Sequence, residues 1–234
     1  MQRKPHRRKP VPIEERRDAT EFADLVTGDH IVSVEALDKS VDGKRDGLVI
    51  YDVATGYLDC YPTNTKNTEE TIQALQHFLG PEGKFGQFYS DAARELYAAA
   101  KAMGLNRDHS TQGRPQSNGV AENKVRKVLE GTRTLLDHAG LPPNYWSYAC
   151  RHFCFGHNHS KFYRRGDELP EPIMFRSLPD GFTILPLYPF GCLVDFLPSA
   201  IFQRKFPKWG TNAQPGILLG YPCHLVAFGK ENFW

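Results

Sequence analysis

The sequence contains no long apolar run. The best candidate, residues 181–197, is interrupted by Pro186, Pro189 and Asp195, whereas a helix that spans a membrane needs about 20 apolar residues. The N-terminus is basic and lacks the apolar segment of a secretory signal peptide. We therefore expect a protein with no membrane partner.

Cysteine is also scarce. The five cysteines are scattered and odd in number, which argues against a disulfide framework and for free thiols in a reducing, intracellular compartment. Cys150, Cys154, His157 and His159 have a spacing like that of a zinc site. Because they alternate with phenylalanines on a predicted helix, packing in the core is the favoured interpretation.

The net charge is low, at +2. Hydrophobic residues make up 40% of the chain and charged residues 24%. This composition is close to that of ordinary globular proteins and excludes global disorder. The charge is unevenly distributed. Seven basic and two acidic residues give the first 17 positions a charge of +5, so the remainder carries −3. A basic arm on a mildly acidic body predicts a polyanionic partner that is held by local patches; a solvated linker is the alternative.

Apolar periodicity and turn signals predict an α/β fold. Three strands come first, and strands then alternate with helices, as in a mixed sheet covered by helices. A polar loop at residues 109–119 precedes the longest helix. The predicted strands cover residues 29–36, 48–53, 57–61, 85–90 and 105–108, and the predicted helices cover 68–79, 92–103, 120–139 and a segment that begins at Pro142.

Three carboxylates stand where these elements begin or end. Asp29 lies in the first predicted strand, Asp91 directly follows the fourth, and Glu122 begins the long helix, so all three could converge at one edge of the sheet. Two Mg²⁺ ions about 4 Å apart stabilise the attacking and leaving oxygens of a phosphodiester, and Mg²⁺ prefers hard carboxylate oxygens. The pattern predicts a two-metal site for phosphoryl transfer.

Each carboxylate also has a simpler interpretation. Asp91 precedes a helix, where aspartate is a favoured N-cap, and Glu122 lies in a first helical turn, where a carboxylate favours the helix dipole. Asp29 competes with Asp24 and Asp52 for the role of first metal ligand. Asp29 is favoured because Asp24 precedes the strand and Asp52 leads into a turn.

The segment Pro-Gln-Ser-Asn-Gly-Val-Ala-Glu at residues 115–122 is the most distinctive motif of the chain. Further distinctive segments are Asp29, Val-Ala-Thr-Gly-Tyr at 53–57, Tyr-Ser-Asp at 89–91 and Gly-Arg at 113–114. Together they resemble the core of retroviral and retrotransposon integrases, whose signature Pro-Gln-x-x-Gly-x-x-Glu is matched at every fixed position. The resemblance covers roughly residues 20–222.

This resemblance implies an RNase H-like fold, which is a mixed five-stranded sheet flanked by helices. It also implies that Asp29, Asp91 and Glu122 coordinate Mg²⁺ or Mn²⁺ and catalyse 3′-end processing and strand transfer. The implied partner is DNA, both the ends of a mobile element and its target. The implied active form is a homo-oligomer that acts in the nucleus.

Cations that follow Glu122 on the long helix are candidates for binding nucleic acid. Lys124, Arg126 and Lys127 could hold phosphates beside the metal site; a solvated helix face is the alternative. Arg126, four residues after Glu122, shares its helix face and could pair with Glu122 or with a phosphate. Lys124 points elsewhere on the helix.

The polar loop before this helix supplies two more candidates. Gln116 and Asn118 could form hydrogen bonds with DNA. Asn118 could equally cap the helix, so both interpretations of that residue stay open.

The C-terminal part has a different composition. Residues 163–182 are charged and proline-rich like an interdomain linker, and short apolar runs follow, consistent with a small β-rich module. Phe-Gly-Cys at 190–192 and Pro-Gly-Ile-Leu-Leu-Gly-Tyr at 215–221 are similar to the SH3-like segment after copia-type integrase cores. The expected organisation is a basic arm at 1–19, a catalytic core with a trailing helix at 20–162, a linker at 163–182 and a truncated SH3-like module at 183–234.

The sequence thus predicts an enzyme of mobile-element integration, a polynucleotidyl transferase that nicks DNA and joins strands with two divalent metal ions. Two alternatives stay open. One is a catalytically inactive or domesticated retrotransposon fragment that only binds nucleic acid, and the other is a different nuclease of RNase H-like fold.

Overall fold

The computed structural model describes residues 19–32, 39–80, 83–91, 93–109, 119–165, 188–197 and 213–221. Five strands form one sheet in the order β3-β2-β1-β4-β5. The first three strands pair antiparallel, whereas β4 pairs parallel with β1 and β5 pairs parallel with β4. The predicted mixed sheet of an α/β protein is therefore confirmed. The strands are β1 (Leu25–Ile31), β2 (Asp46–Asp52), β3 (Leu58–Thr63), β4 (Gln87–Ser90) and β5 (Arg107–His109).

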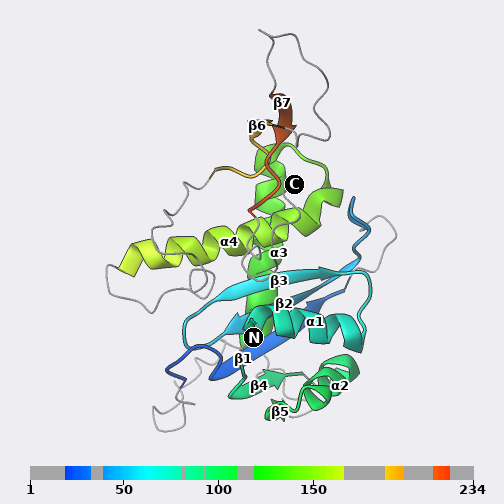
Figure 1. Ribbon diagram of the computed structural model, residues 1–234, viewed down its shortest axis with the longest axis vertical. Coiled ribbons are helices and arrows are strands. Elements are labelled where there is room, and N and C mark those ends of the chain that lie inside the picture. The colour runs from blue at the N-terminus through cyan, green and yellow to red at the C-terminus, as the bar shows by residue number, and fades with distance from the viewer. Residues whose placement is uncertain are drawn as a thin grey trace, which may run out of the picture.

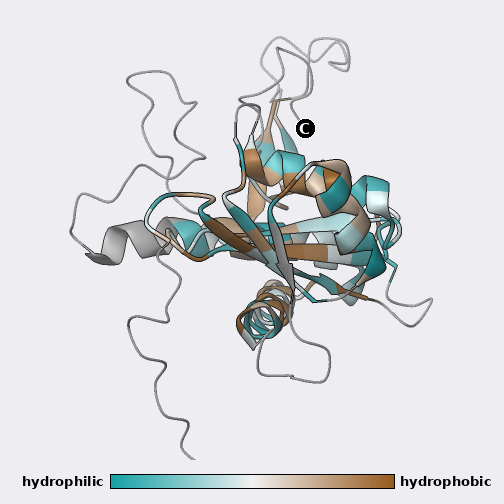
Figure 2. Ribbon diagram, turned by 90° about the horizontal axis from the view of Figure 1, so that it is seen from below, coloured by the Kyte–Doolittle hydropathy of each residue, from teal (hydrophilic) through white to brown (hydrophobic). Residues whose placement is uncertain are grey.

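Helices cover both faces of this sheet. Two helices lie on one face and two on the other, and Figure 2 looks nearly along α3 and shows the sheet between that helix and the pair α1 and α2. The first pair is α1 (Thr68–Leu79) and α2 (Arg94–Ala102); the second pair is α3 (Gly119–Ala139) and α4 (Trp146–Arg165), joined through the short 3₁₀ helix η4 (Pro143–Tyr145).

Successive side chains on the strands pack alternately into two separate cores, one on each face of the sheet. Leu48 and Ile50 of β2 pack with the apolar side chains of α1 and α2, whereas Val49 between them packs with Val128 of α3. This alternation is expected when successive side chains of a strand point to opposite faces. The sheet is thus buried on both sides.

The predicted first strand, residues 29–36, is placed too late in the chain. The strand begins at Leu25 and ends at Ile31, and residues 33–38 lie outside the described part. The apolar pattern misses its start because Thr27 and Gly28 are buried within it. At the other end of the sheet, β3 runs past Pro62 to Thr63, because an edge strand tolerates a residue without an N–H donor.

A second, two-stranded sheet follows the helices, with β6 (Leu193–Phe196) antiparallel to β7 (Gln214–Ile217), and it stands beyond the α3–α4 pair in Figure 1. Its base rests on those helices, where Phe190 is buried with Leu136 and Ala149. The α4 helix includes the first three residues of the predicted linker. The rest of the linker, and nearly all of the predicted basic arm, lie outside the described residues. None of the helices in the described part is long and apolar enough to cross a membrane.

The cysteines of α4 lie in the core. Cys150 and Cys154 are buried beside Cys60 of β3 and Val128 of α3, and none of these three cysteines forms a disulfide. His157 stacks on Phe153. The described residues contain no group of His, Cys, Asp and Glu that could hold a metal ion here or elsewhere. The structure gives this segment a role in packing, which is the interpretation that the sequence favours over a zinc site.

The contact between α3 and α4 depends on Gly131. A Cβ atom at this position would lie 2.1 Å from the ring of Phe153, so the two helices approach closely only because the residue has no side chain. We expect Gly131→Ala to lower the free energy of unfolding by about 1–3 kcal/mol through overpacking. Urea denaturation measures the change.

Gly156 on α4 is the matched control, because a Cβ atom there would meet nothing within 4 Å. Alanine normally stabilises a helix interior by about 1 kcal/mol over glycine, so Gly156→Ala should raise the free energy of unfolding. Stabilisation by both substitutions would contradict the role assigned to Gly131.

Candidate active site

The end of the sheet where β1 and β4 finish gathers the predicted acidic residues. Asp29 lies near the end of β1, opposite Val49 of β2. Asp91 directly follows β4, and Glu122 is in the first turn of α3. Because β1 and β4 are parallel neighbours, their carboxyl ends lie at the same edge of the sheet. Three separate elements thus bring these carboxylates to one end of the molecule.

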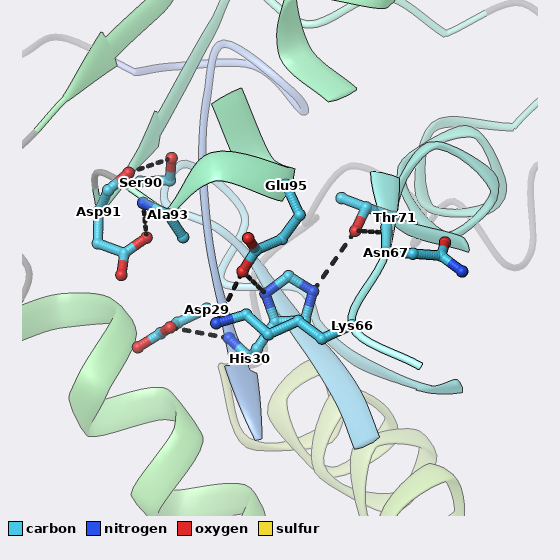
Figure 3. Close-up of polar contacts among 9 residues, drawn as sticks. All are labelled: Asp29, His30, Lys66, Asn67, Thr71, Ser90, Asp91, Ala93 and Glu95. Atoms are coloured by element: carbon cyan, nitrogen blue, oxygen red, sulfur yellow. Dashed lines mark hydrogen bonds and ion pairs between the residues drawn. The ribbon is translucent and has the colours of Figure 1, made fainter. Parts of the chain in front are cut away.

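The charges of Asp91 and Glu122 act on the Asp29 carboxylate. Burial is the main cause that raises the pKa of Asp29; the His30 N–H, which donates to Asp29 Oδ1 at 2.8 Å, opposes it, and the charges of Asp91 and Glu122 raise it further. Figure 3 shows the Asp29 and Asp91 carboxylates on the same side of the strand ends, beside α3 in green. Like charges that repel one another favour a cation among them.

Asp91 is not the N-cap of the helix that follows it. The N-cap of α2 is Ala93, and the Ala93 N–H donates to Asp91 Oδ1 at 3.1 Å. The carboxylate therefore turns back on the loop and leaves its second oxygen on the side of Asp29, as Figure 3 shows.

The competing aspartates have structural roles. Asp24 Oδ2 accepts hydrogen bonds from the N–H groups of Thr20 and Glu21 at 2.9 and 2.7 Å. Asp52 is fully buried and accepts from the Ala23 N–H at 3.1 Å and from the Thr55 N–H at 2.7 Å. Both carboxylates hold turns together, whereas Asp29 faces the other two predicted ligands.

A divalent metal fits the chemistry of these carboxylates, since Mg²⁺ and Mn²⁺ bind carboxylate oxygens. A cation would also relieve the repulsion that Asp91 and Glu122 exert on Asp29. As they lie, however, the described carboxylates do not form a group of three close enough to hold an ion. Glu122 is exposed and lies four residues after position 118, and residues 110–118 lie outside the described part.

The predicted nucleic-acid contacts fall into two sets. Gln116 and Asn118 lie outside the described residues. Lys124 is half-buried with its ammonium 3.7 Å from the centre of the Tyr51 ring, and burial lowers its pKa. Lys127 is also half-buried, and its pKa is lowered first by burial and then by Lys124.

Arg126 projects into solvent with 70% of its side chain exposed. It donates from Nη2 to Asn123 Oδ1 at 3.1 Å, and its Nε lies 3.9 Å from Glu130 Oε1. The predicted pairing with Glu122 is thus replaced by partners on either side along the same helix, since residues three and four apart meet on a helix surface.

Sequence reasoning missed a polar group on the opposite face of β1, where His30 points toward α1 and α2. Lys66 Nζ lies 2.7 Å from Glu95 Oε1, and the same oxygen is 4.0 Å from His30 Nδ1. His30 Nε2 is 3.5 Å from Thr71 Oγ1. Figure 3 shows the group beside Asp29.

Burial, followed by the charge of Lys66, lowers the pKa of His30 to about 4, so the ring is neutral at pH 7. Burial acts to raise the pKa of Glu95, but its hydrogen bond and ion pair with Lys66 outweigh it, and the pKa is lowered. The one signal for this group in the sequence is that His30 follows Asp29; Lys66 and Glu95 lie in segments of ordinary polar composition.

The fold and the site together define an α/β protein with an acidic cluster where two parallel strands end, and with a partly exposed lysine–glutamate pair next to it. No protein-family model matches the chain. Its relatives are retrovirus-related Pol polyproteins of transposons.

Three such relatives show how far the similarity extends. The Pol polyprotein from transposon TNT 1-94 of Nicotiana tabacum is 28% identical over 220 residues, which is 90% of this chain and 15% of the relative. Those from transposons RE1 and RE2 of Arabidopsis thaliana are 34% and 30% identical over 118 residues, which is 47% of this chain and 8% of each relative. The chain thus spans a small part of the curated relatives it matches.

Structural and candidate catalytic aspartates should respond in opposite ways to loss of charge. Asp52→Asn places an amide N–H₂ against buried donors and should lower the free energy of unfolding by about 1–3 kcal/mol. Asp29→Asn removes a partly buried charge that is repelled by two others, so it should raise the free energy of unfolding. Urea denaturation at pH 7 tests both variants.

The pH dependence provides the control. The pKa of Asp29 is raised in the folded state above its ordinary value of 3.8, so the charged form destabilises the fold. This cost shrinks as the pH falls below the folded-state pKa and is gone once the pH is below the ordinary value. Wild type and Asp29→Asn should therefore converge in stability below about pH 3.8. A stability advantage of Asp29→Asn that persists at that pH would mean that its cause is not the charge.

Proposed function

We propose that this chain is the catalytic region of a retrotransposon integrase, a polynucleotidyl transferase that nicks DNA and joins mobile-element ends to target DNA. The observation that carries the proposal is the meeting of Asp29, Asp91 and Glu122 from three elements at one end of the sheet. Kinship with Pol polyproteins supports it.

The topology supports an RNase H-like fold as part of this proposal. Three antiparallel strands are followed by two parallel ones in the order β3-β2-β1-β4-β5, which is the mixed five-stranded sheet expected of such a core. The two-stranded sheet of β6 and β7 supports a small β-rich module after the core. We propose that this module is SH3-like.

In the proposed reaction Asp29, Asp91 and Glu122 would hold two Mg²⁺ or Mn²⁺ ions. When bound, such ions activate the attacking hydroxyl and neutralise the leaving oxygen of a phosphodiester. Asp29 is held by the His30 N–H and Asp91 by the Ala93 N–H, so two ligands are fixed by backbone contacts. Glu122 is exposed at the start of α3 and would complete the site from the opposite side.

Cations on α3 would hold the DNA backbone near these carboxylates. Lys124 and Lys127 lie half-buried on α3 within a turn and a half of Glu122, and burial lowers the pKa of both. A phosphate would restore favourable interactions to such desolvated ammonium groups. Gln116 and Asn118 remain predicted DNA contacts, and a homo-oligomer acting in the nucleus is the expected active form.

Glu122→Gln tests the catalytic assignment, with Glu130→Gln on the exposed side of the same helix as its matched control. We expect wild type to nick supercoiled plasmid and join duplex oligonucleotides in Mn²⁺. Glu122→Gln should lower both rates by about 100-fold or more, since changing a group that merely supports a metal ligand already costs about 10- to 100-fold. Glu130→Gln should keep the wild-type rates.

A DNA-binding protein without chemistry is the second candidate function. It is favoured by the observation that the described carboxylates, as they lie, form no group that could hold a metal. Tight DNA binding with no nicking in Mg²⁺ or Mn²⁺ would establish it and overturn the proposed transferase. Cleavage of an RNA–DNA hybrid in preference to duplex DNA would instead identify a different nuclease.

A further inference from the structure

The pair formed by Lys66 and Glu95 has a position that packing alone does not explain. Lys66 lies in the loop between β3 and α1, directly before the N-cap Asn67, and Glu95 lies in the first turn of α2. These two helices begin at the end of the sheet where Asp29 and Asp91 lie. A long-range ion pair therefore joins the loop before α1 to the first turn of α2 beside the acidic cluster.

We propose that Lys66 contacts a DNA phosphate next to the site of reaction, and that Glu95 is the positioning residue that holds Lys66 there. The proposal rests on the proposed function, because it takes the polyanion at this end of the sheet to be DNA. It adds a contact from the α1–α2 face of the sheet to those predicted from α3.

The geometry leaves Lys66 able to bind an anion. Its Nζ lies 2.7 Å from Glu95 Oε1, and 35% of its side chain is exposed, whereas the Glu95 side chain is only 17% exposed. An ammonium group has three donors, and one carboxylate oxygen on the inner side does not saturate them. The carboxylate anchors the cation from within, and the outer side of the cation faces solvent.

The same geometry directs this cation toward the candidate active site. Lys66 is close enough to Asp29 for its charge to act on that carboxylate, and Figure 3 shows its ammonium end reaching past the His30 ring to the side of Asp29. His30 is buried and follows Asp29 on β1. A phosphate whose oxygens lie near Asp29 would therefore be within reach of Lys66.

Charge explains why a local contact of this kind is needed. Outside the basic arm the chain is net negative, so its body as a whole repels a polyanion, and the acidic cluster repels it most. Phosphate binding then depends on individual cations placed beside the carboxylates. Lys66 supplies such a cation from the face opposite to Lys124.

Salt dependence of DNA binding tests the proposal without requiring chemistry. The 234-residue chain, with Glu122→Gln to prevent turnover, is titrated with duplex DNA over a series of salt concentrations. Each phosphate contact contributes about 0.9 to the slope of log K against log salt. We expect Lys66→Gln to reduce the magnitude of the slope by about 0.9, and Lys66→Arg to restore it.

Lys101 provides the matched control, because it is exposed in the last turn of α2, at the far end of that helix from Glu95. Lys101→Gln should leave the slope unchanged. An equal loss of slope in the Lys66 and Lys101 variants would show a general charge effect and would overturn the contact.

Lysine acetylation read by mass spectrometry supplies a second measurement that needs no substitution at Lys66. DNA should slow acetylation of Lys66 several-fold and leave that of Lys101 unchanged. In the free protein, Glu95→Gln should speed acetylation of Lys66, because the ion pair that holds it is lost. Equal acetylation of Lys66 with and without DNA overturns the proposal.

The outcomes separate this proposal from the proposed function. If wild type lacks strand transfer but the slope falls in Lys66→Gln, the transferase assignment fails and the phosphate contact stands. If wild type is active and the slope is unchanged in Lys66→Gln, the contact fails and the transferase stands. A chain that does not bind DNA at all overturns both.

Discussion

The alternation of side chains on the central strand β1 is the constraint on which the candidate site depends. Asp29 and His30 are consecutive residues, so they point to opposite faces of the sheet. Asp29 faces the side of α3 and Glu122, and His30 faces α1, α2 and the Lys66–Glu95 pair. A slip of one residue in the pairing with β2 would exchange the two faces. Antiparallel pairing on one side and parallel pairing on the other hold that register.

Stability and the candidate chemistry oppose each other at this end of the molecule. Asp29 is partly buried and repelled by two carboxylates, so its charge destabilises the fold. Burial also raises the pKa of Asp52, against three hydrogen bonds that act to lower it and that hold its turn together. The surroundings must therefore hold the acidic cluster in place. The close contact between α3 and α4 at Gly131 does this from one side, and the Lys66–Glu95 ion pair does so from the other.

The parts of the fold that the sequence predicts well are those with strong local signals. The apolar period of residues 68–79 and the Gly80-Pro81 that follows predict a helix with the same bounds as the structure shows. The start of β1 was missed because burial by helices on both faces, not an apolar pattern, makes Thr27 and Gly28 part of a strand. The ion pair between Lys66 and Glu95 could not be predicted, since it joins a loop to the first turn of α2, and the meeting of these segments depends on the whole sheet.

The side chain of Asn158 has a consequence for association between chains. Its amide accepts from the Leu58 N–H at 2.9 Å and donates to the Leu58 carbonyl at 2.8 Å, so a residue of α4 takes the place of a strand neighbour on β3. Because β3 is an edge strand, its unpaired backbone groups would otherwise offer a template for a strand of another molecule. With this residue occupied and Pro62 further along the same edge, β3 is protected against edge-to-edge aggregation.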